Sequence, residues 1–288
     1  MYNLTDIKQI KSILTKHGFN FSKSFGQNFL INPQVPEDIV KFSKINEKSG
    51  VIEIGPGMGT LTYELCKTAK KVVSIEIDKK LIPVLNDTMA DFSNFHLINQ
   101  DVLKTDLRSL IKTEFDGMDV YICANLPYYI TTPIIMKLLE EELDVKAITV
   151  MVQKEVAKRL CATEKDKENG AISLAVQYYT TPYYLFDVAP DNFIPAPKVT
   201  SSVIQLVPKK EKVFCKNKEF MFKIIKAAFS QRRKTLSNAL ANNSSLKISK
   251  ENINKVIKIC DFPENIRGES LSLNDFARFS DELFIFSD

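Results

Sequence analysis

Residues 51–62 read VIEIGPGMGTLT, in which a short apolar run precedes three glycines at alternate positions and then a helical pattern. Glycine is needed where the backbone turns sharply or approaches a ligand closely, because it adopts positive φ angles without steric cost. The stretch therefore predicts a buried strand, a tight turn and the start of a helix. An ordinary turn before a helix and a dinucleotide-binding fold are alternatives that this stretch alone leaves open.

Further short apolar runs repeat the pattern that begins at residues 51–54. They are residues 72–75, 95–98, 119–124 and 147–152. Helical patterns lie between them, at residues 61–67, 79–89 and 133–142. Short, nearly all-apolar runs are typical of parallel strands that are buried on both faces. The alternation predicts an α/β fold with a doubly wound sheet, helices on both faces and ligands at the carboxyl ends of the strands.

The pattern changes towards the end of the chain. Residues 183–188 and 199–207 predict two more strands, and a proline-rich loop, residues 189–197, lies between them. After residue 208 the pattern turns helical, with amphipathic candidates at residues 220–229, 234–241, 251–259 and 273–286. We therefore expect an α/β domain over residues 1–207 and a small all-helical domain over residues 208–288.

The composition is that of a globular protein, with 44% hydrophobic and 26% charged residues among 288. No apolar run reaches the roughly 18 residues that a membrane span needs. The first residues lack the basic and apolar regions of a signal peptide, so we expect a cytoplasmic protein. We also expect a monomer.

Metal chemistry has no support in the sequence. The five cysteines are Cys66, Cys123, Cys161, Cys215 and Cys260, and no two of them have the spacing of metal ligands. The two histidines, His17 and His96, lie in no ligand or triad pattern. Reduced, mostly buried thiols and no bound metal are the expectation.

Positive charge is concentrated in the expected helical domain. Residues 208–288 hold 16 Lys and Arg against 10 Asp and Glu, whereas the whole chain holds 39 against 35. A modest excess of this kind is often only a solvated surface. A nucleic-acid partner is the sharper interpretation, because phosphates require nearby cations.

Two acids follow the expected strands at positions where a nucleoside is bound in doubly wound sheets. Glu76 ends the second strand, where a carboxylate can hold ribose hydroxyls, and Asp101 follows the third, where it can accept from an adenine amino group. The glycine spacing differs from the Gly-x-Gly-x-x-Gly of nicotinamide enzymes. With Glu53 ahead of it, the turn resembles the S-adenosylmethionine motif of Rossmann-like methyltransferases. Its expected cofactor-binding glycines are Gly55, Gly57 and Gly59.

The fourth expected strand runs into Asn125-Leu126-Pro127-Tyr128. An Asn-Pro turn would explain Pro127 alone. A site for methylating an adenine amino group explains the whole segment. The lone pair of the adenine amino nitrogen is delocalised into the ring, which makes this nitrogen a poor nucleophile. If the Asn125 side-chain oxygen and the Leu126 carbonyl each accept one hydrogen of the amino group, the lone pair is directed towards the methyl donor. Tyr128 can stack on the base, contributing about 1–3 kcal/mol. The base must be flipped out or unpaired, and no strong general base is needed.

These motifs resemble the ribosomal RNA adenine dimethyltransferase family over nearly the whole chain. Residues 23–30 resemble its opening motif, in which Asn28 and Leu30 would contact the cofactor. Gly55, Glu76, Asp101 and Asn125 match its remaining cofactor positions. The resemblance implies a Rossmann-like S-adenosylmethionine methyltransferase sheet, with S-adenosylhomocysteine as the product.

Two later segments carry the resemblance towards the RNA. Residues 193–199 resemble the late substrate-side motif, and residues 229–236 resemble the hallmark of the helical domain in the small-subunit branch. That branch dimethylates two adjacent adenosines in a hairpin loop near the 3′ end of 16S ribosomal RNA. The chain departs from the frequent Asn-Leu-Pro-Tyr-Asn-Ile-Ser pattern at Tyr129 and Thr131.

Several residues are candidates for the RNA side. Arg232, Arg233 and Lys234 are expected to project from a helix towards phosphates. Phe193 is either a second stacking face for the target base or a buried anchor of its loop. Lysines of the N-terminal segment are a further candidate path for RNA, namely Lys8, Lys11, Lys16 and Lys23.

Other functions remain to be weighed against the small-subunit enzyme. A large-subunit adenine methyltransferase of the macrolide-resistance type shares the cofactor and reaction motifs. An RNA-binding assembly factor without catalysis is disfavoured by the intact Glu76, Asp101 and Asn125. A nicotinamide oxidoreductase is disfavoured by the glycine spacing.

Overall fold

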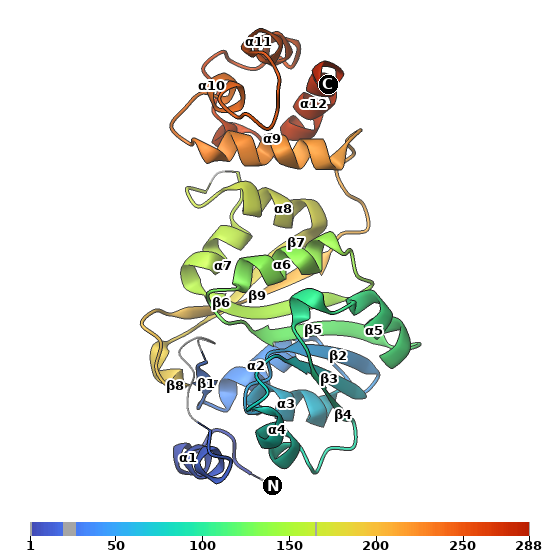
Figure 1. The fold of residues 1–288 in the computed structure, drawn as a ribbon, viewed down its shortest axis with the longest axis vertical. Helices are drawn as coiled ribbons and strands as arrows, with labels where there is room; N and C mark the ends of the chain where they lie inside the picture. The colour runs from blue at the N-terminus through green and yellow to red at the C-terminus, as the bar shows by residue number, and fades with distance from the viewer. Residues whose placement is uncertain (1, 20–26, 165, 288) are drawn as a thin grey trace. The chain divides into compact units, whose positions relative to one another are not determined.

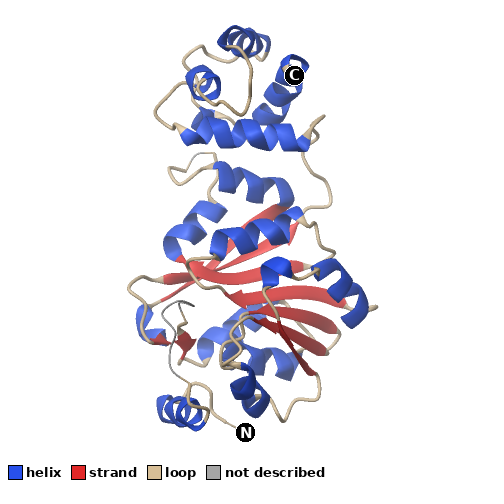
Figure 2. Ribbon diagram, in the orientation of Figure 1, coloured by secondary structure: helices blue, strands red, loops and turns tan. Residues whose placement is uncertain are grey.

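The computed structural model describes residues 2–19, 27–164 and 166–287. Strands and helices alternate through most of the chain (Figure 2). The strands are β1 (Phe29–Leu30), β2 (Ser49–Ile54), β3 (Lys71–Glu76), β4 (Phe95–Asn99), β5 (Asp119–Asn125), β6 (Ala147–Gln153), β7 (Thr180–Val188), β8 (Phe193–Ile194) and β9 (Ser201–Pro208). The α-helices are α1 (Ile7–Lys16), α2 (Gln34–Ser43), α3 (Thr60–Thr68), α4 (Ile82–Thr88), α5 (Leu107–Glu114), α6 (Thr131–Glu140), α7 (Lys154–Cys161), α8 (Ala171–Tyr179), α9 (Lys218–Ser230), α10 (Leu236–Ala241), α11 (Lys250–Ile259) and α12 (Leu273–Leu283).

Seven strands form one sheet, in the order β4-β3-β2-β5-β6-β9-β7. The strands from β4 to β6 are parallel, and β9 runs antiparallel to β6. In the centre, Ile52 lies beside Val73 on one neighbouring strand and Ile122 on the other. The expected doubly wound sheet is therefore confirmed, and all five strands expected in its parallel part are present.

Helices cover both faces of the parallel strands, as expected. In Figure 1, α2 and α3 lie against one face, and α5 and α6 lie against the other. Val51, Val72 and Cys123 pack into one apolar cluster with residues of α2 and α3. Their sequence neighbours point to the opposite face, because successive side chains in a strand alternate. Burial on both faces explains why β2 has no exposed position and why its residues are mostly apolar.

The strand order reverses beside β2, and this reversal creates the site. The chain leaves β2 towards β3 and β4 on one side, and it returns to β5 on the other side of β2. Right-handed crossovers then place the connecting helices on opposite faces and leave a crevice at the carboxyl ends of β2 and β5.

The structure contains a second, two-stranded sheet that was not expected from the sequence. β1 pairs antiparallel with β8, so that Phe29 lies opposite Ile194 and Leu30 opposite Phe193. The Ile31 amide continues the pairing and donates to the Asn192 carbonyl at 2.9 Å. The segment before α2 is thus held by the proline-rich loop and is not a free connection.

The described residues divide into two compact units. One is Met1–Ala157 with Pro182–Pro208, and the other is Lys158–Thr181 with Lys209–Asp288. One of these divisions falls between Pro208 and Lys209, one residue after the expected boundary between residues 207 and 208, and residues 158–181 group with the helical part. Their aromatic side chains are the reason, because Tyr178 and Tyr179 form a cluster with Phe222 of α9, at ring-centroid distances of 5.3 and 6.0 Å.

The four expected C-terminal helices are present as α9 to α12, and the last of them ends at Leu283 before a short 3-10 turn, Phe284–Phe286. Their core contains Ile224, Leu240, Phe276 and Phe279, all of them fully buried. Among the described residues, no helix has the length and apolar character that crossing a membrane would require.

Candidate active site

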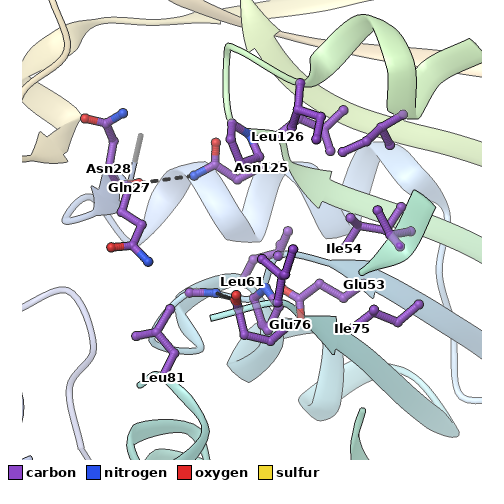
Figure 3. A pocket seen from close by; sticks show the side chains of 18 of the residues that line it. Gln27, Asn28, Glu53, Ile54, Leu61, Ile75, Glu76, Leu81, Asn125 and Leu126 are labelled. Carbon is purple, nitrogen blue, oxygen red and sulfur yellow. Dashed lines mark hydrogen bonds between the residues drawn. The ribbon is translucent and has the colours of Figure 1, made fainter. Parts of the chain in front are cut away.

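One cavity opens at the carboxyl ends of β2 to β5, where the strand order reverses (Figure 3). Its empty volume, including its open mouth, is about 1070 Å³, which is ample for a nucleoside-sized ligand. The site residues predicted for the cofactor and the reaction line it, with the exception of Gly59; they are Asn28, Leu30, Gly55, Gly57, Glu76, Asp101, Asn125, Leu126 and Tyr128. The structure therefore brings together residues that are spread over a hundred positions of the sequence.

The glycine turn has the backbone that the spacing predicted. Gly55, Gly57 and Gly59 all have positive φ angles, of 69°, 63° and 99°. A Cβ atom on Gly57 would lie 3.2 Å from the Phe29 ring, and one on Gly59 would lie 2.9 Å from the end of Met89. Gly59 does not line the cavity; it makes the bend from which α3 begins.

Glu76 ends β3 with its carboxylate at the cavity wall. The side chain is 5% exposed and accepts hydrogen bonds from the Asp78 amide at 2.8 Å and the Gly57 amide at 3.4 Å. The second bond joins Glu76 to the glycine turn. Burial raises the pKa of Glu76 to about 7, although the backbone donors oppose this shift.

Glu53, which precedes the glycine turn in the sequence motif, is a buried carboxylate. It accepts hydrogen bonds from the Thr62 and Ser74 hydroxyls, both at 2.7 Å, and thereby joins β2, β3 and α3. Burial raises its pKa to about 7 against the effect of these donors, and the nearby charge of Glu76 raises it further.

Asp101 lies after β4, at the edge of the cavity. One carboxylate oxygen accepts from the Leu103 amide at 2.9 Å and caps the 3-10 helix Val102–Lys104. The cap fixes the side chain at the end of its strand, beside the wall that carries Glu76.

The reaction segment is held by its neighbours at each residue. The side-chain amide nitrogen of Asn125 donates to the backbone carbonyl of Asn28 at 3.3 Å, as the dashed line in Figure 3 marks. The Leu126 amide donates to the Met151 carbonyl at 3.1 Å. The Pro127 carbonyl accepts from the Thr131 hydroxyl at 3.0 Å, so the departure at Thr131 supports the segment.

Tyr128 is half-buried and reaches from the segment to β9. Its hydroxyl forms a hydrogen bond of 2.8 Å with the hydroxyl of the buried Ser201. Burial raises the pKa of Tyr128 above its ordinary value, although the hydrogen bond with Ser201 opposes this shift. The contact fixes the position of the hydroxyl end of the ring that was predicted to stack on a base.

The opening segment bridges the two walls of the cavity. Gln27 donates to the Asp78 carboxylate at 2.9 Å, beyond the end of β3, while the Asn28 carbonyl accepts from Asn125 at the end of β5. Lys23, which was predicted to lie along the RNA path, falls outside the described residues.

Phe193 does not offer a stacking face. Its side chain is 3% exposed and packs in the apolar core with Leu30 and Val188. Pairing of β8 with β1 turns the ring inwards, so the buried anchor, and not the second stacking surface, is the interpretation that agrees with the structure.

The basic triplet Arg232, Arg233 and Lys234 lies in the turn between α9 and α10, not on a helix as expected. All three side chains are exposed. Arg232 donates to the Lys167 carbonyl at 2.8 Å and lies 3.6 Å from Glu269. The turn therefore presents three cations to solvent, one of them partly engaged.

The thiols are not reactive groups of the site. All five cysteines are free, and Cys66, Cys123 and Cys260 are buried. Burial raises the pKa of Cys123 to about 12. Within residues 2–19, 27–164 and 166–287, no three His, Cys, Asp or Glu side chains form a group that would hold a metal ion.

Comparison with known proteins supplies the family. The model of the family described as ribosomal RNA adenine dimethylase matches residues 18–273. The chain is 48% identical over 284 residues to ribosomal RNA small subunit methyltransferase A of Alkaliphilus metalliredigens, covering 98% of this chain and 99% of that protein. It is 49% identical over 276 residues to the protein of that name in Bacillus licheniformis, covering 95% and 94%.

Solved structures show the same fold. A dimethyladenosine transferase from Plasmodium falciparum aligns with a TM-score of 0.70 and 28% identity, over 87% of this chain and 95% of that one. The 23S rRNA methyltransferase ErmE aligns with a TM-score of 0.65 over 89% and 100%, and at 20% identity it is similar in fold alone. From the match over residues 18–273 and the two bacterial relatives, we conclude that this chain belongs to the ribosomal RNA adenine dimethylase family.

Proposed function

We propose that this chain transfers methyl groups from S-adenosylmethionine to N6 of two adjacent adenosines in the hairpin loop near the 3′ end of 16S ribosomal RNA. Membership of the family makes it an S-adenosylmethionine-dependent ribosomal RNA adenine dimethyltransferase. The observation that carries the proposal is one cavity in which a glycine turn, two acids and Asn125 meet at the ends of four neighbouring strands.

The lining residues fit the cofactor chemically. Glu76, nearly buried at the end of β3, suits ribose hydroxyls, and Asp101 at the neighbouring strand end suits an adenine amino group. A Cβ atom on Gly55 would meet no atom within 4 Å, so the absent side chain leaves room beside the turn. When bound, S-adenosylmethionine supplies a methyl group on a positively charged sulfur.

The proposed chemistry depends on orientation. With its amide nitrogen engaged by the Asn28 carbonyl, Asn125 has its oxygen left to accept one hydrogen of the target amino group. The Leu126 carbonyl would accept the other, and Tyr128, held by Ser201, would stack on the base. Held in this way, the adenine nitrogen would be directed at the methyl group that bound S-adenosylmethionine would supply. The proton leaves to water, so the residues act by positioning and electrostatics.

For the RNA partner, family membership gives ribosomal RNA but no further detail. We infer that the substrate is the immature small subunit, that the chain acts as a monomer in the cytoplasm, and that Arg232, Arg233 and Lys234 contact phosphates. The exposure of all three cations in one turn supports the last inference. The relatives named for the small subunit favour this branch over the large-subunit alternative.

The target is tested by deleting the gene and mapping ribosomal RNA by mass spectrometry. The two adjacent adenosines should lose their dimethylation, and adding the purified protein to those subunits should restore it. Persistence of both modifications would contradict the assignment. Protection of a sensitive host from macrolides would instead support the large-subunit enzyme.

The role of Asn125 is tested by Asn125→Ala. We expect kcat to fall about 100- to 1000-fold, by analogy with the loss of one oriented hydrogen bond at a transition state, while RNA binding is retained. Asn32→Ala is the matched control, because Asn32 bonds to Asn192 at 2.7 Å and does not line the cavity. Turnover of Asn125→Ala close to that of the control would contradict the proposed role.

A further inference from the structure

Tyr129 is an aromatic side chain at the cavity that the proposed reaction does not use. It is 59% exposed although it lines the cavity, and no hydrogen bond to another described residue engages its hydroxyl. It also stands where the family pattern often has Asn. An exposed aromatic ring at the mouth of a ligand site is typical of a contact that forms when the ligand binds.

Tyr128 and Tyr129 are adjacent in sequence but have different surroundings. The Tyr128 hydroxyl is bound to Ser201 of β9, on the side of the sheet away from β3 and β4. Tyr129 lines the cavity together with Asp101 and Glu76; burial raises its pKa, and the negative charges of these two acids raise it further. Tyr129 therefore lines the cavity within electrostatic range of both acids.

Ile77 supplies an exposed apolar side chain to the same cavity. Ile77 directly follows Glu76, lines the cavity and is 49% exposed. A planar base would offer both side chains the apolar contact that they lack, with the Asp101 carboxylate at its edge.

We propose that Tyr129 packs on the adenosine half of S-adenosylmethionine, opposite the contact made by Ile77, and so sets the affinity for the cofactor. This inference rests on the proposed function, because it takes Glu76 and Asp101 as the residues that hold the adenosine. Tyr128 remains the face for the target base. Tyr128 would thus contact the target adenine, and Tyr129 would contact the adenine of the cofactor.

The experiment measures binding of S-adenosylmethionine, and of 5′-methylthioadenosine as a probe without the amino-acid tail, by titration calorimetry without RNA. Tyr129→Ala and Tyr129→Asn should weaken both ligands by about tenfold, the size expected for loss of one aromatic stacking contact. Tyr129→Phe should restore most of the affinity. At saturating cofactor, the KM for unmethylated small subunits should stay unchanged.

Two results would overturn the inference: an unchanged Kd in Tyr129→Ala, or a raised KM for small subunits with cofactor affinity intact, which would assign Tyr129 to the RNA. Thermal unfolding checks that the exposed substitution leaves the fold intact. Glu76→Ala distinguishes a failure of this inference from a failure of the proposed function. If wild type binds neither ligand, or Glu76→Ala binds both fully, the proposed cofactor site itself is wrong.

Discussion

Glu53 is an acid buried in the sheet, and its hydrogen-bond donors among the described residues are the hydroxyls of Thr62 and Ser74. Its pKa is raised from 4.5 to about 7 by burial. Between these values the folded protein holds a proton that the unfolded chain releases. Stability from this group is therefore fully present below pH 4.5 and is lost as pH rises through 7.

The magnitude follows from the shift. A pKa difference of about 2.5 units corresponds to about 3 kcal/mol, of which about 2 to 3 kcal/mol falls between pH 5 and pH 8. Glu53→Gln keeps the shape and an accepting oxygen but cannot ionise. We expect this variant to equal wild type near pH 5 and to be about 2 to 3 kcal/mol more stable at pH 8.

The assay is urea unfolding of the ligand-free protein at half-unit steps from pH 5 to pH 8. The difference between wild type and Glu53→Gln reports on this group together with its electrostatic coupling to Glu76, while the titrations of uncoupled groups are common to both. Glu37→Gln, at an exposed position of α2, is the matched control and should follow wild type at every pH. A constant difference between Glu53→Gln and wild type across the range would refute the reasoning, because it would mean that Glu53 does not change charge there.

Three further predictions concern the fold and the RNA. Gly59→Ala should destabilise the protein by about 1–2 kcal/mol in thermal unfolding, because φ is 99° there, and an unchanged melting temperature would argue against this turn. Phe193→Ala should cost about 3–5 kcal/mol in urea unfolding as a buried ring, and a loss under about 1 kcal/mol would point back to a surface role. Replacing Arg232, Arg233 and Lys234 with Gln should weaken RNA binding and lower its salt slope by about 1 per cation; an unchanged slope would exclude phosphate contact.

The cavity could be predicted from sequence because its parts are local signals at strand ends. The glycine turn, Glu76, Asp101 and Asn125 each follow an apolar run that is readable by itself. Parallel strands place their carboxyl ends at one edge, so the fold class alone brings these residues together. The residue types of the segment Asn125-Leu126-Pro127-Tyr128 indicate the chemistry, and the family resemblance implies the ribosomal RNA target.

The remaining parts depend on contacts between distant segments. β1 and β8 have two residues each, too few for any periodicity, and their pairing joins positions more than 160 residues apart. The same pairing buries Phe193, which the sequence left as either a stacking face or an anchor. Residues 158–181 group with the helical unit through aromatic packing, and no domain-boundary signal in the sequence indicates this grouping.

The pairing of β1 with β8 has a consequence at the reaction segment. It seats the opening segment where Gln27 reaches Asp78 and the Asn28 carbonyl faces Asn125. An asparagine suits that position better than an aspartate would, because one end of the amide donates to Asn28 and the other end accepts. A carboxylate would direct an acceptor at the carbonyl oxygen and lose the fixed orientation. The contact from the N-terminal segment therefore explains why an amide, and not an acid, stands at the end of β5.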